Sequence, residues 1–134
     1  MKIAAGFVII QDNKILLEHP TGSKWWGTYS IPKGEVEAEE TFLEAATREF
    51  QEELGIKIDI EYTNEDPDGY IDYTDEDGEI YKRLYYFVVE PGEYLEIDKN
   101  KLQKEEIDYA GFLTKEEAEK RIFWRLKSLL AYVK

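Results

Sequence analysis

The sequence has 134 residues, of which 43% are hydrophobic and 14% aromatic, so we expect one domain spanning residues 1–134 with its own core. It contains no cysteine, which excludes disulfides, thiolate metal sites and cysteine nucleophiles and fits a reducing compartment. Thirty acidic against 17 basic residues give a net charge of −13, which disfavours binding to nucleic acid or to an anionic membrane.

The N-terminal segment is typical of a β-hairpin. Apolar residues 3–10 and 15–17 flank Asp12-Asn13, a pair that favours a tight turn. The apolar run is too short to cross a bilayer and lacks a small-residue cleavage site, so we expect a strand of a cytoplasmic protein. A loop with Gly and Trp residues follows from Pro20 to Gly34, and we interpret the lone His19 before it as a turn residue.

A helix is predicted next, because Thr41 and Glu44 form a capping box and Gly55 stands where a helix should end. Residues 56–61 then alternate as a strand does. The segments 70–73 and 79–89 flank an Asp77-Gly78 turn, which predicts a second hairpin.

A second capping box, Thr114 with Glu117, predicts a C-terminal helix. Its apolar residues recur with helical spacing on one side: Ala118, Ile122, Leu126, Leu129, Leu130 and Val133. Strands before and after a central helix, with another helix at the end, predict an α/β or α+β sandwich with a mixed β-sheet between helices.

Three glutamates of the central helix are the first candidates for chemistry. On a helical wheel Glu49, Glu52 and Glu53 fall within an arc of about 100°, beside the apolar arc that must face the core. Closely spaced carboxylates repel one another unless cations lie among them, and their oxygens suit Mg²⁺, which completes its shell with water and phosphate. The alternative is an ordinary solvated face in a chain rich in glutamate.

The wider spacing favours a functional motif. The segment from Gly34 to Ile56 contains Glu40 and then Arg48-Glu49-Phe50-Gln51-Glu52-Glu53-Leu54-Gly55-Ile56. It resembles the Nudix hydrolase signature, G-x5-E-x7-R-E-U-x-E-E-x-G-U, at every fixed position, with Phe50 where an aliphatic residue is usual. The resemblance implies an α/β/α sandwich with a mixed sheet. It also implies metal-dependent hydrolysis of a pyrophosphate linkage in a nucleoside diphosphate joined to another group.

Carried over by position, the resemblance implies roles for single residues. Glu49, Glu52 and Glu53 would bind Mg²⁺, with Mn²⁺ as a substitute, and the Gly34 carbonyl would be a further ligand. Arg48 would orient a neighbouring glutamate, with Glu40 as a supporting acid. The general base would be a glutamate of the signature or of a later loop, for which Glu106 is the first candidate and Glu65 the second.

The expected partner is a small-molecule nucleotide. Lys33 and Lys24 are candidates to bind phosphate, and Tyr29 and Trp26 are among the aromatic residues that could stack on a base. The leading substrates are a nucleoside triphosphate or a dinucleoside polyphosphate. A nucleotide sugar, an RNA 5′ end and a nucleotide sensor without catalysis stay as alternatives. The choice between a monomer and a homodimer stays open.

Overall fold

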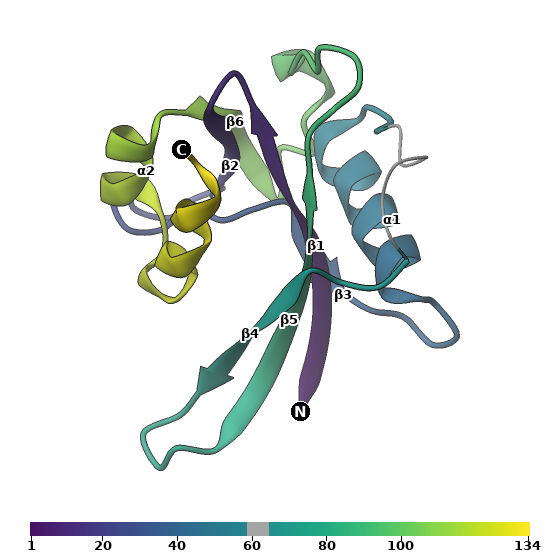
Figure 1. Cartoon of the computed structure of the whole chain (residues 1–134), viewed down its shortest axis with the longest axis vertical. Coiled ribbons are helices and arrows are strands. Elements are labelled where there is room, and N and C mark those ends of the chain that lie inside the picture. Colours follow the sequence, from purple (N-terminus) through teal and green to yellow (C-terminus); the bar gives the residue numbers. More distant parts are fainter. Residues whose placement is uncertain (59–64) are drawn as a thin grey trace.

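The computed structural model describes residues 1–58 and 65–134. Figure 1 shows its elements, which are β1 (Lys2–Gln11), β2 (Lys14–Pro20), β3 (Lys33–Glu35), α1 (Phe42–Leu54), β4 (Gly69–Thr74), β5 (Ile80–Val89), the 3₁₀ turn η1 (Lys99–Lys101), β6 (Ile107–Leu113), α2 (Lys115–Arg121) and the 3₁₀ segment η2 (Trp124–Tyr132). Among the described residues, no helix combines the length and apolar character needed to cross a membrane.

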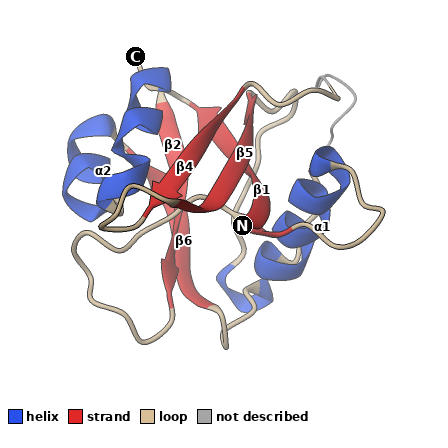
Figure 2. Cartoon of the chain, turned by 90° about the horizontal axis from the view of Figure 1, so that it is seen from below, coloured by secondary structure: helices blue, strands red, loops and turns tan. Residues whose placement is uncertain are grey.

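Strand β1 is the centre of a mixed sheet. The sheet order is β4-β5-β1-β2-β6, and the short β3 pairs with the N-terminal half of β1. Among the strands of the described residues, β1 and β5 pair in parallel, and the other strand pairs are antiparallel. Helix α1 covers one face of the sheet, and α2 with η2 covers the other (Figures 1 and 2). The predicted mixed sheet between helices is therefore confirmed.

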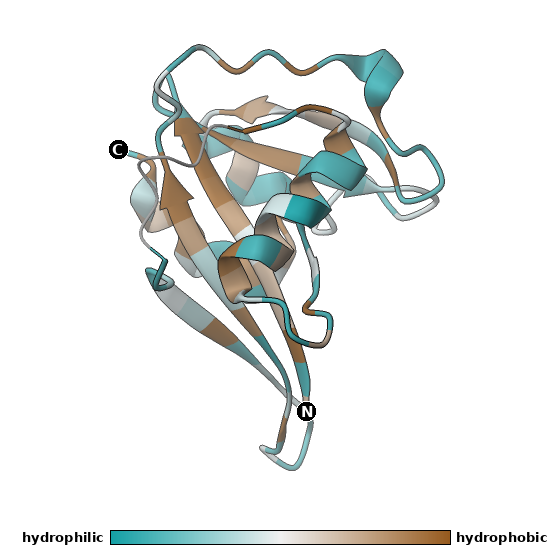
Figure 3. Ribbon diagram, turned by 90° about the vertical axis from the view of Figure 1, so that its right-hand side faces the viewer, coloured by the Kyte–Doolittle hydropathy of each residue, from teal (hydrophilic) through white to brown (hydrophobic). Residues whose placement is uncertain are grey.

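The core has two parts because β1 alternates its side chains between two covered faces. Residues 4, 8 and 10 pack in the cluster with α2 and η2, and residues 5, 7 and 9 pack in the cluster with α1. Figure 3 shows the apolar strands behind α1, whose outer surface is hydrophilic. Burial on both faces explains why β1 is an almost continuous apolar run.

The predicted local signals of α1 and of both hairpins are confirmed. Thr41 and Glu44 form the complete capping box, and Gly55 ends the helix in the left-handed region at φ 67°. Asp12 and Asn13 both have positive φ, as a tight hairpin turn requires. At the second hairpin, the Asp75 amide donates to the Glu79 carbonyl over 2.9 Å, and Gly78 has φ 82°.

The single C-terminal helix was a wrong prediction. Helix α2 ends at Arg121, residues 122 and 123 are extended, and η2 continues as a 3₁₀ segment. The break has a tertiary cause, because the Phe123 amide donates to the Tyr29 carbonyl (2.9 Å) and the Tyr29 amide donates to the Arg121 carbonyl (2.8 Å). All six residues of the predicted apolar face are nevertheless buried. Thr114 caps α2 by accepting a hydrogen bond from the Glu117 amide.

The segment after α1 and His19 also differ from what the sequence predicts. Residues 56–58 do not form a strand, and the remainder of the predicted strand, residues 59–61, lies outside the described residues. His19 is not a turn residue, since it is buried within β2 and both of its ring nitrogens have polar partners.

Candidate active site

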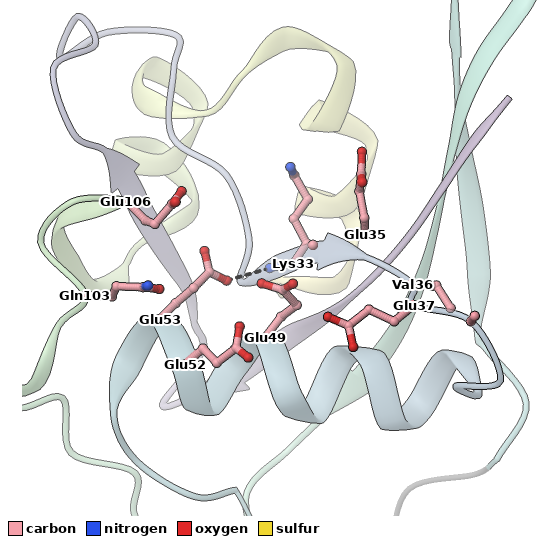
Figure 4. Close-up of a pocket in the computed structure, with 11 residues that line it drawn as sticks. Lys33, Glu35, Val36, Glu37, Glu49, Glu52, Glu53, Gln103 and Glu106 are labelled. Atoms are coloured by element: carbon pink, nitrogen blue, oxygen red, sulfur yellow. Dashed lines mark hydrogen bonds between the residues drawn. The ribbon is translucent and has the colours of Figure 1, made fainter.

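A pocket of about 760 Å³ opens between α1, β3 and the segment that precedes β6. It contains six of the predicted site residues, which come from separate parts of the sequence (Figure 4). The lining residues are Lys33, Gly34, Glu35, Val36, Glu37, Ala38, Glu49, Glu52, Glu53, Gln103 and Glu106. Helix α1 supplies the three glutamates of the predicted triad to one wall of this pocket.

The three glutamates differ in burial. Glu53 is 8% exposed, Glu49 is half-buried and Glu52 is exposed. The Glu53 Oε1 atom accepts a hydrogen bond from the Lys33 amide over 3.1 Å, so β3 fixes this carboxylate against the sheet. Burial raises the pKa of Glu53 to about 7, and the nearby charge of Glu49 acts in the same direction.

Gly34 lies where a side chain does not fit. A Cβ atom at this position would lie 2.0 Å from Cδ of Glu49 and 2.2 and 2.4 Å from its two carboxylate oxygens. Strand β3 can therefore approach α1 this closely only because residue 34 is glycine.

Arg48 does not line the pocket, but it connects Glu40 with Glu49 of the pocket wall. Its Nε and Nη2 atoms donate to the two oxygens of Glu40 over 2.7 and 3.0 Å, and Nη1 donates to Glu49 Oε1 over 2.9 Å. Nη2 also donates to the Glu35 carbonyl over 2.9 Å. The Arg48 hydrogen bonds lower the pKa of Glu40, which keeps that partner anionic. The contact from Nη1 holds the Glu49 carboxylate in place.

A fourth acid, Glu18 of β2, lies next to Glu53, and the sequence analysis did not identify it. It is 2% exposed. Burial and the nearby Glu53 charge raise the pKa of Glu18 well above its usual range. The available signal was its position directly after Ile15-Leu16-Leu17, an apolar run typical of a strand buried on both faces.

The donor chemistry fits a hard divalent cation. The Glu18 Oε2 atom is buried with no hydrogen-bond partner in the described part of the chain. The carboxylates of Glu49 and Glu53 face the same pocket, and burial raises the pKa of both, so a cation would stabilise their charged forms. Within residues 1–58 and 65–134, however, no three acidic or imidazole side chains are arranged as a preformed metal cage. Arg48 forms ion pairs with both Glu49 and Glu52.

Positive charge in the pocket wall comes from β3, and a second lysine on β5 lies near it. Lys33 lies in the pocket wall, and Lys82 of β5 is adjacent to it. Burial, together with the Lys33 charge, lowers the pKa of Lys82 to about 8. The Lys82 Nζ atom also lies 4.9 Å from the ring centroid of Tyr73. No local signal in the sequence indicates Lys82, since its proximity to Lys33 arises from the pairing of both β3 and β5 with β1.

Four further predicted residues do not line this pocket. Lys24 and Trp26 are exposed on the loop after β2, and the Arg121 Cζ atom lies 4.1 Å from the ring centroid of Trp26. The Tyr29 ring is only 4% exposed and packs against His19. Glu65, the second candidate base, is an exposed residue before β4.

Comparisons with known proteins agree with this architecture. The family model described as NUDIX domain matches residues 1–133. A search of curated proteins found no match to the chain.

Solved structures with the same fold include an Ap4A hydrolase from C. elegans in a binary complex, with 23% identity and a TM-score of 0.76, covering 98% of this chain and 93% of that one. A MutT NUDIX hydrolase from Burkholderia pseudomallei has 20% identity and a TM-score of 0.77, and the match covers 99% of this chain and 98% of that one. The E. coli dihydroneopterin triphosphate pyrophosphohydrolase has 17% identity and a TM-score of 0.67, and the match covers 98% of this chain and 94% of that one.

Proposed function

Since the chain belongs to the Nudix family of pyrophosphohydrolases, we propose that it uses Mg²⁺ to hydrolyse a pyrophosphate bond in a nucleotide with at least a diphosphate. The proposed substrates are a nucleoside triphosphate or a dinucleoside polyphosphate. The observation that supports this most strongly is the position of Glu49 and Glu53 in one pocket with Gly34, Glu106 and Lys33. Carboxylates and a lysine in one pocket suit a metal ion and an anionic substrate.

Glu49, Glu52, Glu53 and the Gly34 carbonyl are the residues that would hold the metal ion, for which Mn²⁺ is a substitute. When bound, a divalent ion neutralises phosphate charge and makes a water molecule more acidic. Arg48 orients Glu49, because a guanidinium with five donors can hold Glu40 and Glu49 at once. Glu53 is oriented by the Lys33 amide.

Glu106 is the proposed general base. It reaches the pocket from the side opposite α1, as Figure 4 shows, so an attacking water could lie between it and the triad. An exposed carboxylate is available to accept a proton, whereas Glu53 is buried and already accepts a hydrogen bond from the Lys33 amide.

The phosphate chain is proposed to lie against Lys33 and Lys82. Two adjacent ammonium groups repel each other, and an anion between them relieves that repulsion. The loop with Lys24 and Trp26 borders the pocket at Glu106, because the Thr21 amide donates to the Glu106 carbonyl over 3.0 Å. Lys24 and Trp26 are therefore proposed contacts for the far end of a long substrate. Tyr29, which we predicted as a residue that stacks on a base, is buried against His19 and would support this loop instead.

The test is product analysis on a panel of nucleoside triphosphates, dinucleoside polyphosphates and nucleotide sugars, with and without Mg²⁺. A triphosphate cleaved between its α and β phosphates gives a monophosphate and pyrophosphate. We expect Mg²⁺-dependent cleavage by the wild type and loss of activity by orders of magnitude in Glu53→Gln. The matched control is Glu119→Gln, which alters an exposed glutamate of α2 outside the pocket lining.

Three results would contradict the proposal in different ways. Cleavage of a nucleotide sugar or a capped RNA 5′ end alone would replace the substrate class. Nucleotide binding without cleavage by the wild type would favour a sensor. An unchanged rate in Glu53→Gln would remove the triad from the mechanism.

A further inference from the structure

His19 is the only histidine of the chain, and it has a well-defined environment in β2. It is 1% exposed, and its ring stacks on Trp25 with centroids 3.7 Å apart and planes at 4°. Its Nδ1 atom lies 2.5 Å from Oδ1 of Asp108 on β6. Its Nε2 atom lies 2.9 Å from the Lys24 carbonyl and 3.2 Å from the Ser23 carbonyl.

The Nε2 atom must carry a hydrogen. Two of its neighbours are carbonyl oxygens, which only accept. The third is the Ser23 hydroxyl at 3.3 Å, which uses its own hydrogen to donate to the Pro20 carbonyl over 2.6 Å. The ring therefore meets acceptors on this side.

The Nδ1 atom faces a carboxylate, which also accepts. A contact of 2.5 Å between Nδ1 and Oδ1 needs a hydrogen between the two atoms, and we place it on Nδ1. Among the described residues, Tyr29 also packs on the ring, with its ring centroid 5.2 Å away, and Tyr109 and Arg121 lie next to Tyr29. The contact with Asp108 is therefore an ion pair between an imidazolium and a carboxylate.

This ion pair is part of a larger contact between β2 and the segment around Glu106. The ladder between β2 and β6 shifts its register between His19 and Pro20, and proline has no amide hydrogen to continue it. The His19–Asp108 pair and Thr21 instead connect β2 to the segment around Glu106. The Thr21 amide donates to the Glu106 carbonyl over 3.0 Å, and its hydroxyl donates to the Lys104 carbonyl over 2.7 Å.

Residues 19–21 thus hold the chain at residues 104, 106 and 108, on both sides of the glutamate that faces the pocket. We propose that His19, paired as an imidazolium ion with Asp108, is a positioning residue that fixes Glu106 at the pocket. The inference rests on the proposed function in one respect, the role of Glu106 as the base. The charge state of His19 does not depend on it.

Histidine-selective ¹⁵N NMR tests the ion pair without any activity measurement, because His19 gives the only imidazole signals. At the pH of the activity assay, both ring nitrogens should show a directly bonded hydrogen. In Asp108→Leu, which removes the acceptor, only Nε2 should keep one. A hydrogen on Nε2 alone in the wild type would overturn the proposal.

A kinetic double-mutant cycle tests the positioning role. Asp108→Leu should lower kcat by roughly 10- to 100-fold through misplacement of Glu106, with KM almost unchanged. In the Glu106→Gln background the same substitution should have no further effect. Glu105→Gln, an exposed neighbour, is the matched control and should leave kcat unchanged.

If Asp108→Leu lowers kcat equally in the wild type and in the Glu106→Gln background, Asp108 has a merely structural role and the proposal is overturned. If Asp108→Leu does not fold, Thr21→Val replaces it in the same cycle, since it removes only the hydroxyl contact to Lys104. A wild type that cleaves no nucleotide would reject the proposed function together with the role of Glu106. The NMR result would still decide the ion pair in that case.

Discussion

Glu18 of β2 and Glu53 of α1 are two neighbouring buried acids, 2% and 8% exposed. Burial raises the pKa of both carboxyl groups, because it disfavours their charged forms. The Glu53 carboxylate is fixed by the hydrogen bond that it accepts from the Lys33 amide. A carboxylate fixed in this way is preorganised for a cation but destabilises the fold while no cation is bound.

The first prediction follows from the direction in which the pKa of Glu53 is shifted. Its pKa is raised from 4.5 to about 7, so the folded chain binds more protons than the unfolded chain between these values. Stability without metal should therefore fall as pH rises from about 4.5 to 7, by on the order of 2–3 kcal/mol. In Glu53→Gln the part of this fall that Glu53 causes should disappear, whereas the part caused by the buried Glu18 should remain.

Thermal or urea unfolding with EDTA at several pH values measures this slope. Mg²⁺ should restore stability at pH 8 in the wild type and not in Glu53→Gln, because an ion that binds only the folded form raises its melting temperature. The control is Glu119→Gln, which should follow the wild type. Parallel slopes in all three proteins would contradict the assignment of Glu53.

The second prediction concerns Gly34→Ala. The added methyl group would overlap the Glu49 carboxylate, which would have to move away from the pocket. We expect kcat to fall by about 100-fold or more, because small displacements of a catalytic group are costly. Glu49 is near the surface and can rotate, so circular dichroism should show an intact fold. Activity close to that of the wild type would mean that Glu49 does not need its present position.

Local signals explain which features could be predicted correctly. The capping box at Thr41 and the left-handed Gly55 define α1 from neighbours in the chain alone, and helical spacing then groups Glu49, Glu52 and Glu53. The turn at Asp12-Asn13 is equally local. Such features do not depend on the remainder of the fold, which is why the amino-acid sequence alone is sufficient to locate the triad.

The missed features depend on contacts between distant residues. The C-terminal helix breaks after Arg121 because Tyr29, almost a hundred residues earlier, pairs with that segment. Lys82 reaches Lys33 only through the pairing of β5 and β3 with β1, and His19 finds Asp108 through the β2–β6 pairing. Periodicity and capping contain no information on such pairings.

The third prediction concerns Arg48→Lys. An ammonium group keeps the charge but cannot donate to both oxygens of Glu40 and also reach Glu49 and the Glu35 carbonyl. We expect kcat to fall roughly 10-fold or more while KM changes little, because the metal carboxylates lose their orientation rather than a substrate contact. Steady-state kinetics measures both. A rise in KM at constant kcat would instead place Arg48 in contact with the substrate.

The last prediction uses the lowered pKa of Lys82. A lysine with a pKa of about 8 loses its charge as pH rises through 8, well below the ordinary value of 10.5. If Lys82 binds the phosphate chain, kcat/KM should decrease above pH 8 in the wild type, because this ratio follows the ionisation of the free enzyme. In Lys82→Met, kcat/KM should be lower and should lack this decrease. Lys127→Met, on the exposed surface of η2, is the control and should keep the wild-type profile. A profile that Lys82→Met leaves unchanged would show that the phosphate chain does not lie against Lys82.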